Sequence, residues 1–338
     1  MKVYEIEKFG IDELLFVDRD TPKPAANEVL IKFHAFSINY RDVMMIEGTY
    51  NPRLRVPAIP FSDGAGEIVE IGEKVTRWKV GDRVSPIFMQ GWIDGRIDKG
   101  ISRTAIGGGK PWDGVLREYA AFDESGIVAI PEYLSYQEAA TLPCAAVTAW
   151  NALAVSGNLR AGDTVLTLGT GGVSVFALQI AKMFGAEVIS TSSSDEKLSK
   201  MRELGADHLI NYRTREDWDK AVMDLTGGRG VDHVVEVGGT GTLSRSVNAV
   251  RIGGHIALIG ALDISGEFNP LPLFMKSIRA QGIFVGSRSY FEALNKAFAV
   301  NEIKPVIDKV FDLSSTREAL KYMKSGSHVG KVVIKVYE

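Results

Sequence analysis

A glycine-rich turn between an apolar run and a helical pattern constrains the fold of this chain more than any other feature. In TVLTLGTGGVSVFALQIAK, the apolar run ends at Leu168, the turn holds Gly169, Gly171 and Gly172, and a helix is expected from about Val173. Glycine permits the tight turn and lets a pyrophosphate approach the backbone, and the helix N-terminus offers free N–H groups. The strand–turn–helix context therefore predicts a dinucleotide-binding loop.

Strand and helix patterns keep alternating after this loop. EVISTS precedes DEKLSKMRELGA, HLINY precedes REDWDKAVMDLTGG, VDHVVEVGG precedes TLSRSVNAVRIGG, and HIALIGA and IFVG follow. Buried parallel strands form continuous apolar runs, and this spacing is typical of a doubly wound sheet. The third position of the glycine pattern is Ser174, which is small enough for close packing of helix on strand. We therefore predict an α/β fold with a Rossmann domain over residues 126–286.

The remaining sequence has a different pattern and predicts a β-rich domain. EVLIKFHAF alternates, and GAGEIVEIG and GDRVSPIF carry strand and turn signals. Segment 89–114 is dense in glycine and irregular, and loops of this length are usually functional or disordered. The C-terminal HVGKVVIKVYE is again strand-like, so we expect it to return to the first domain. The predicted β-rich domain is thus discontinuous, formed by residues 1–125 and 287–338.

Composition excludes several classes of function. The chain has 338 residues, a formal net charge of −3 and 39 scattered basic residues, which predicts no nucleic-acid footprint. No apolar run reaches the roughly 18 residues of a membrane span, and MKVYEIEKFG contains no signal-peptide core. The single cysteine, Cys144, permits no internal disulfide and fits a reducing compartment. We expect a cytoplasmic protein that binds neither nucleic acid nor membrane.

The end of the second Rossmann strand favours NADP(H) as the cofactor. NAD-binding folds place an acidic residue about 20 residues after the first glycine, where it binds the ribose 2′-OH. Counting from Gly169, this chain has Ser192 and Ser193 there, and Asp195 comes later, in the expected first helical turn. Hydroxyl groups with Lys197 nearby suit a 2′-phosphate, which an acidic residue would repel. Serines at this place can also act only as helix caps.

Motifs along the whole chain resemble the medium-chain dehydrogenase/reductase superfamily. These motifs are GEKVTRWKVGDRV, LPCAAVTAW, LGTGGVS, ELGADHLINY and GVDHVVEVGG. The resemblance implies a GroES-like catalytic domain interrupted by the Rossmann domain. In zinc-dependent members, three residues bind the catalytic zinc, and their positions fall here at Asn39, Ser62 and Cys144. Because only the cysteine survives and a catalytic zinc needs three protein ligands, we predict no metal site.

The substitution pattern is similar to the zinc-independent, quinone oxidoreductase-like branch, in which asparagine replaces the cysteine at the position of Asn39. This resemblance implies that Tyr50 faces the nicotinamide, and it implies a homodimer or homotetramer. The resemblance also assigns cofactor contacts to Thr148, Ser192, Lys197, Tyr212, Val237, Gly238, Gly260, Leu262, Phe284, Val285 and Lys331.

The implied activity is hydride transfer from NADPH to a quinone or an α,β-unsaturated carbonyl without catalytic zinc. Such acceptors develop negative charge on oxygen, which donors aimed at that oxygen stabilise. The candidate catalytic donors are Asn39, Tyr40, Arg41 and Tyr50.

Alternative interpretations remain open at this stage. Asp42 is also placed to cap the helix VMMIEG, and Arg41 to pair with Asp42 or Asp63. A zinc-type alcohol or aldehyde dehydrogenase with an atypical site, for example Cys144 with Asp63, is the second hypothesis. A cofactor-binding protein with little catalysis is the third.

Overall fold

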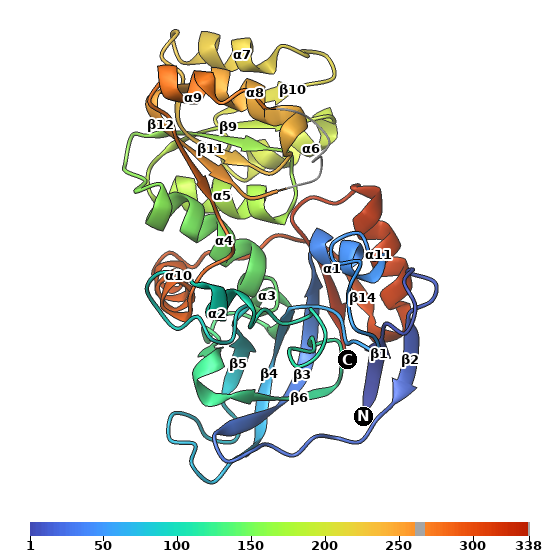
Figure 1. The fold of residues 1–338 in the computed structure, drawn as a ribbon. Coiled ribbons are helices and arrows are strands. Elements are labelled where there is room, and N and C mark those ends of the chain that lie inside the picture. Colours follow the sequence, from blue (N-terminus) through green and yellow to red (C-terminus); the bar gives the residue numbers. More distant parts are fainter. Residues whose placement is uncertain (261–267, 337–338) are drawn as a thin grey trace. The chain divides into compact units, whose positions relative to one another are not determined.

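The computed structural model describes residues 1–260 and 268–336, and the chain forms two compact units. Unit 1 comprises Met1–Val147 with Gly286–Glu338, and unit 2 comprises Thr148–Val285. Unit 1 extends past residue 125 because strand β7 (Ile127–Ala129) pairs with β5 (Arg83–Pro86) of the same sheet. The α/β fold with a β-rich and a Rossmann part is confirmed (Figure 1).

Unit 2 is built on one parallel sheet. Its strands lie in the order β10 (His208–Asn211), β9 (Glu187–Ser192), β8 (Thr164–Leu168), β11 (Val231–Glu236), β12 (Val250–Leu258) and β13 (Arg279–Gly282). All neighbouring pairs are parallel. Counted from β8, this is the doubly wound order 3-2-1-4-5-6, which changes direction between β8 and β11.

Helices follow the strands of unit 2 as the alternating pattern predicts. They are α5 (Gly172–Met183), α6 (Asp195–Glu203), α7 (Trp218–Leu225), α8 (Thr240–Ala249) and α9 (Leu271–Met275). In Figure 1, α7 and α8 lie on one face of the sheet and α5 on the other, so the strands are covered on both sides. Their apolar runs are accordingly buried, as at Leu166, Val234 and Ile256.

The prediction of a strand at IFVG is wrong, because the strand in this region lies earlier in the sequence. Strand β13 ends at Gly282, before this run begins. Val285 has a φ of 56°, a left-handed conformation that a β-branched residue rarely adopts and that a strand cannot contain. Its carbonyl instead accepts a hydrogen bond of 2.7 Å from Asn151 Nδ2.

The segment SYQEAATLPCAAVTAWNAL has a helical sequence pattern, but its helix is interrupted. It forms α3 (Tyr136–Ala139), a π-helical segment at Leu142–Ala146, α4 (Val147–Trp150) and a second π-helical segment at Asn151–Ser156. Wider π turns are uncommon and recur at functional sites. Cys144 lies in the first of them.

Unit 1 contains a larger, mixed sheet. Its main path runs β14 (Ile307–Asp312), β15 (Lys331–Lys335), β3 (Glu28–Ile38), β4 (Asp63–Ile71), β5 and β7, and β6 (Tyr119–Asp123) also pairs with β3. Strands β1 (Lys2–Glu5) and β2 (Leu15–Asp18) form a separate antiparallel pair. The predicted return of the C-terminal strand is confirmed, because β15 pairs with β3.

Four helices belong to unit 1 besides α3. They are α1 (Tyr40–Ile46), α2 (Lys99–Ser102), α10 (Arg288–Val300) and α11 (Thr316–Ser325). At the end of β3, Phe36, Ser37 and Ile38 are all buried, so the strand loses its alternation there and is covered on both faces. Asp63 and Lys331, which begin the neighbouring strands at this end, are buried as well.

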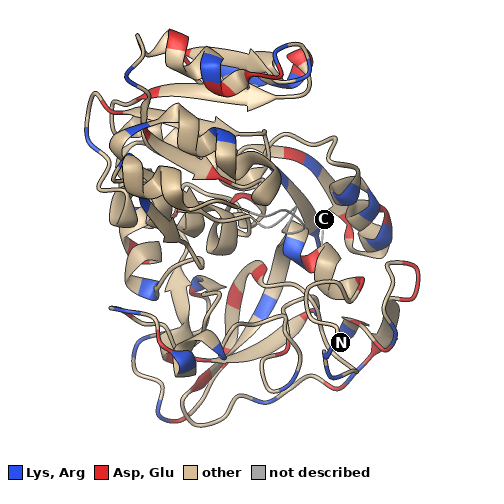
Figure 2. Ribbon diagram, turned by 45° about the horizontal axis from the view of Figure 1, so that its top comes forward, with Lys and Arg blue, Asp and Glu red and all other residues tan. Residues whose placement is uncertain are grey.

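Basic and acidic residues both occur throughout the two units. Figure 2 shows basic and acidic residues interspersed along the ribbon of each unit. Among the helices of the described residues, none has the length and apolar character needed to cross a membrane.

Candidate active site

Three strand ends of unit 1 meet at one place because of the antiparallel register. Ser37 of β3 faces Asp63, the first residue of β4, and Ile38 faces Val332, the second residue of β15. The next residues along the chain, Asn39 after β3 and Lys331 at the start of β15, are thereby brought beside Asp63. The site is thus assembled from segments separated by more than 290 positions in sequence.

The Lys331 ammonium is the centre of this cluster. Lys331 is 2% exposed, and its Nζ donates to Ile38 O at 2.9 Å and to Asn39 Oδ1 at 2.5 Å. The Asp63 carboxylate oxygen Oδ2 lies 3.8 Å from the same nitrogen, so a buried cation faces a buried anion. A buried charge needs such partners, since desolvation without them costs several kcal/mol.

Asp63 collects further donors around its two oxygens. Ser62 Oγ donates to Oδ1 at 2.9 Å, and the Cys144 backbone N–H donates to Oδ2 at 3.3 Å. Burial raises the pKa of Asp63, and the nearby Lys331 opposes that rise. The surrounding protein raises the pKa of the Cys144 thiol to about 12, with Asp63 adding to the effect. The Cys144 thiol is therefore protonated at neutral pH when no metal is bound.

Asn39 is the N-cap of α1, and Asp42 takes part in the cap from the first turn. The Asn39 backbone N–H donates to Asp42 Oδ2 at 2.8 Å. The helix begins at Tyr40, so the expectation that Asp42 is the N-cap of VMMIEG is wrong by three residues. Burial raises the pKa of Asp42 to about 7, with Arg41 opposing, and its Oδ1 accepts no hydrogen bond from the part of the chain that the structure describes.

The sequence suggested Asp42 or Asp63 as an ion-pair partner of Arg41. Among the described residues, Arg41 forms an ion pair with neither. Its Nη1 and Nη2 donate to Ile106 O at 3.4 and 3.3 Å. The guanidinium carbon lies 5.3 Å from the Tyr50 ring centroid and 4.9 Å from that of Phe88, within cation–π range of both. Tyr40 and Tyr50 are 42% and 46% exposed, so both phenols are accessible.

The irregular segment 89–114 is anchored within unit 1. The backbone N–H groups of Arg288 and Ser289 donate to Trp92 O at 2.8 Å and Ile93 O at 3.0 Å, and the Trp92 ring packs against Tyr290. The segment also supplies the carbonyl that receives Arg41. An ordered loop of this length over a candidate catalytic residue is consistent with a functional role.

In unit 2, the glycine loop has the expected form. Strand β8 ends at Leu168 and α5 begins at Gly172, as predicted. Gly169 has a φ of 71°, and a Cβ added at Gly169 or Gly171 would meet open space. Ser174 is buried and its Oγ donates to Leu168 O at 2.7 Å, which explains why serine suffices at the third position. The bare backbone and the helix N-terminus fit a dinucleotide pyrophosphate.

The other cofactor candidates in unit 2 lie around the carboxyl ends of the parallel strands, where such sheets bind ligands. Val237 and Gly238 follow β11, and Gly260 follows β12. Gly260 packs so closely against Val237 that an added Cβ would lie 1.8 Å from Val237 O. Tyr212 follows β10 and is 40% exposed, as is Phe284 after β13. The remaining assignments have these positions: Thr148 is buried in α4, Val173 is the second residue of α5, Val285 is buried, and Leu262 lies outside the described residues.

The tip of β9 carries hydroxyl groups and no acidic side chain. Ser192 ends the strand and is buried, whereas Ser193 is half-buried. Ser194 is the N-cap of α6, with its Oγ accepting from Lys197 N at 3.4 Å. Asp195 lies in the first turn of that helix, as predicted, and accepts a hydrogen bond of 2.7 Å from Asn211 Nδ2.

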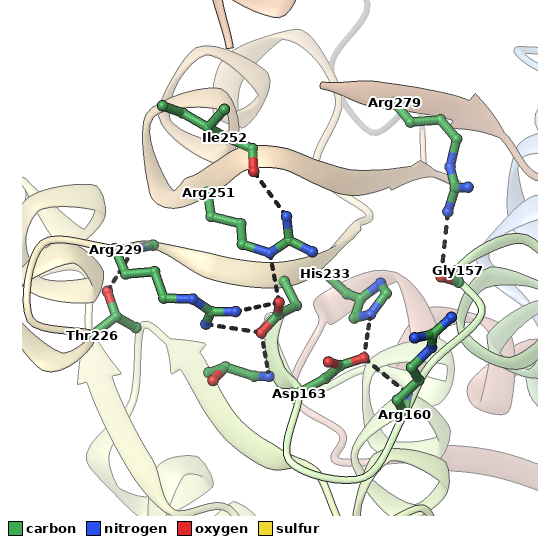
Figure 3. Close-up of polar contacts among 12 residues, drawn as sticks. Gly157, Arg160, Asp163, Thr226, Arg229, His233, Arg251, Ile252 and Arg279 are labelled. Atoms are coloured by element: carbon green, nitrogen blue, oxygen red, sulfur yellow. Dashed lines mark hydrogen bonds and ion pairs between the residues drawn. The ribbon is translucent and has the colours of Figure 1, made fainter. Parts of the chain in front are cut away.

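A second buried polar cluster lies at the opposite, amino ends of the unit 2 strands (Figure 3). His233 and His255 are neighbours through the parallel register of β11 and β12, with ring centroids 5.7 Å apart. His233 Nε2 lies 3.1 Å from Asp163 Oδ2, and His255 Nε2 lies 3.2 Å from Ser156 Oγ. These partners support the structural interpretation of both histidines over a ligand role.

A doubly wound sheet with a glycine loop, together with a GroES-like sheet, defines the class of two-domain nicotinamide-dependent oxidoreductases. Residues 25–132 match the family "Alcohol dehydrogenase GroES-like domain", and residues 172–299 match "Zinc-binding dehydrogenase". The chain belongs to the medium-chain dehydrogenase/reductase superfamily.

Individual relatives carry different names. A zinc-type alcohol dehydrogenase-like protein of Schizosaccharomyces pombe is 41% identical over 97% of this chain and 96% of its own. The human quinone oxidoreductase is 28% identical over 99% of this chain and 97% of its own. The crystal structure of a putative alcohol dehydrogenase from Sinorhizobium meliloti 1021 has a TM-score of 0.92 and 42% identity, covering 99% and 98% of the two chains. These names support the superfamily and leave the branch open.

The residues at the former zinc position do not fit a zinc ion. Among the described residues, no three His, Cys, Asp or Glu side chains are grouped so that they could hold a metal. The position instead combines the Asn39 amide, a protonated Cys144 thiol and the buried ammonium of Lys331. A dication would face the Lys331 cation, and the anion that contacts this ammonium among the described residues is Asp63.

Sequence reasoning missed the link between Lys331, Asn39 and Asp63. Lys331 was assigned as a cofactor contact and Asp63 as a partner of Arg41, but the two form an ion pair with each other. The available signal was a lysine at the start of an otherwise apolar strand that returns to β3. Without the register, nothing in the sequence indicates which acid it would meet.

Proposed function

We propose that this protein is an NADPH-dependent reductase that transfers a hydride to a quinone or an α,β-unsaturated carbonyl without catalytic zinc. The observation that carries the proposal is the buried ammonium of Lys331 beside Asn39, at the position where zinc-dependent relatives bind metal. Bound NADPH would supply the hydride. The name of the human quinone oxidoreductase, a relative over nearly the whole chain, supports this class of acceptor.

The residues of unit 1 suit an acceptor that needs hydrogen-bond donors more than a Lewis acid. Hydride addition to a conjugated carbonyl leaves negative charge on its oxygen. Within the described residues, Asn39 Nδ2 forms no hydrogen bond of ordinary geometry, and the Tyr40 and Tyr50 phenols are accessible. The fixed guanidinium of Arg41 adds positive potential beside Tyr50. An alcohol has no such conjugated oxygen and must lose a proton, for which these residues offer no evident strong base.

The phosphate form of the cofactor is supported by the tip of β9. Ser192 is the last residue of β9, and Ser193 follows it. The next acidic residue along the chain, Asp195, accepts a hydrogen bond from Asn211. Lys197 and Tyr212 are the cation and phenol that we assign to the 2′-phosphate. A dianionic phosphate favours positively charged and hydroxyl donors.

A substrate screen tests the proposal directly. Purified protein with NADPH should reduce members of a panel of quinones, enones and enoyl thioesters, and should oxidise simple primary and secondary alcohols at least about 100-fold more slowly in kcat/KM. Faster alcohol oxidation than enone or quinone reduction would contradict the proposal and favour a zinc-type dehydrogenase. Tight NADPH binding with no turnover across the panel would favour a cofactor-binding protein with little catalysis.

A further inference from the structure

The identity of the two polar atoms of the Asn39 side chain is fixed by Lys331. An ammonium has three hydrogens and no lone pair, so it donates hydrogen bonds and cannot accept one. The Asn39 atom that lies 2.5 Å from Lys331 Nζ must therefore be the carbonyl oxygen. Without a charged neighbour, the two orientations of an amide differ little, and assigning them depends on the surrounding network.

The Asn39 amide nitrogen is consequently turned away from Lys331. It is buried and forms no hydrogen bond of ordinary geometry within the described residues. The Asn39 amide helps to lower the pKa of Asp63, so the Asp63 carboxylate lies near it without saturating its two hydrogens. Buried donors without partners are rare in folded proteins, and a role in binding is one of the few explanations for them.

We propose that Lys331 is a positioning residue that holds the Asn39 amide with its N–H groups directed toward the acceptor oxygen of the substrate. The Lys331 ammonium is itself held by Ile38 O and Asp63, so Asn39 Oδ1 meets a cation whose place is fixed. Donation to Oδ1 also polarises the amide and strengthens its N–H groups as donors. The substrate part of this inference rests on the proposed function; the orientation of the amide does not.

The size of the expected effect follows from the strength of a charged hydrogen bond. Turning the amide would bring its N–H groups against the ammonium and lose a bond to a charged donor, which makes the turned form roughly 10- to 150-fold rarer. Removing the charge of Lys331 should therefore allow both orientations. Relaxed positioning of a transition-state donor lowers kcat more than it alters cofactor affinity.

A double-mutant cycle tests this inference. We expect Lys331→Met and Asn39→Ala each to lower kcat for the best quinone or enone by about 10- to 100-fold, with the NADPH Kd changed less than about threefold. Because Lys331 acts through Asn39, the double variant should be no slower than Asn39→Ala alone. The proposal would be overturned if the kcat losses of the two single variants multiplied in the double variant. It would also be overturned if Lys331→Met lost as much NADPH affinity as kcat. The second result would make Lys331 a cofactor contact.

A second variant and a measurement without turnover keep the test decisive. Lys331→Met leaves the Asp63 anion buried alone, so Lys331→Met/Asp63→Asn, which removes both charges, replaces it if the single variant does not fold. In ¹⁵N NMR spectra, the side-chain NH₂ signals of Asn39, identified by their loss in Asn39→Ala, should move in either Lys331 variant. Unchanged signals would overturn the positioning role. If the wild-type protein reduced no substrate of the panel, the proposed function would fail while these signals still decided the orientation.

Discussion

Single residues at the end of β3 show how burial sets chemistry. Asp42, Asp63 and Cys144 all have raised pKa values because the surrounding protein removes water, and the Asp42 pKa reaches about 7. Donors and a cation keep the Asp63 carboxylate in place, whereas burial and the Asp63 charge together raise the pKa of the Cys144 thiol. The same environment therefore preserves an ion pair and disfavours a thiolate ligand.

A residue-scale prediction concerns the choice between NADPH and NADH. Lys197→Ala should raise the Kd of NADPH about 10- to 100-fold, because a charged hydrogen bond to phosphate contributes about 1.5–3 kcal/mol. The Kd of NADH, which lacks that phosphate, should change less than about threefold. Fluorescence titration of both cofactors measures the two constants.

Lys200→Ala is the matched control, because Lys200 is an exposed lysine about one helical turn after Lys197 in α6. This variant should bind both cofactors like the wild-type protein. Equal weakening of NADPH and NADH in Lys197→Ala would remove the assignment of Lys197 to the 2′-phosphate.

Pairs of elements bring together groups that neither element could position alone. The parallel register of β11 with β12 places His233 against His255. The loop before β8 adds Asp163, which contacts His233 (Figure 3). Burial lowers the pKa of His255 to about 3, with Arg279 and His233 adding to the effect. Burial also lowers the pKa of His233, although Asp163 opposes it.

This strand pairing predicts how stability depends on pH. The folded-state pKa of His255 lies below its ordinary value of 6.5, so the unfolded chain binds the proton first as pH falls. The contribution of neutral, buried His255 to the free energy of unfolding is fully present above about pH 6.5. It is lost as the pH falls toward 3, by up to about 1.4 kcal/mol per pH unit. His255→Gln should therefore lose less stability than the wild-type protein between pH 7.5 and 5, as measured by urea unfolding.

His208→Gln provides the control for this measurement, since His208 lies in an outer strand with a partly exposed side chain. All other titrating groups are common to the variants, so differences between them isolate one histidine. Parallel loss of stability in His255→Gln and the wild-type protein would refute the role assigned to this buried pair.

At the scale of the whole molecule, one unit interrupts the other. The chain leaves unit 1 after Val147, forms the parallel sheet, and returns at Gly286. The last strand, β15, then completes the sheet next to β3 and delivers Lys331 to the cluster around Asn39. Each unit has a continuous apolar core of its own.

A prediction about metal belongs to this scale, because it concerns the intact protein. Dialysis against a chelator should change neither kcat nor the melting temperature by more than experimental error, since Lys331 and Asp63 already satisfy each other's charge. Elemental analysis of the purified protein should find well below one zinc per chain. Stoichiometric zinc whose removal abolishes activity would contradict the proposed zinc-independent reaction.

The sequence by itself determined most of the fold and the dinucleotide loop. The signals there are local: an apolar run ending at Leu168, glycines in the turn and a helical pattern from about Val173. Local signals are reliable because backbone freedom and hydrophobic periodicity act over a few residues. The prediction of a strand at IFVG is wrong although its apolar pattern is local too. That pattern suits a strand, but Val285 adopts a left-handed backbone conformation.

Only the tertiary structure decided what surrounds Asn39. The sequence indicated that a metal ligand is missing there, but Lys331 lies 292 positions away and Asp63 opens a different strand. Their meeting depends on the register of three antiparallel strands, which pairs residues regardless of their separation in sequence. Electrostatic and hydrogen-bond energies depend on distances of a few ångströms, so the chemistry of this cluster follows from that register.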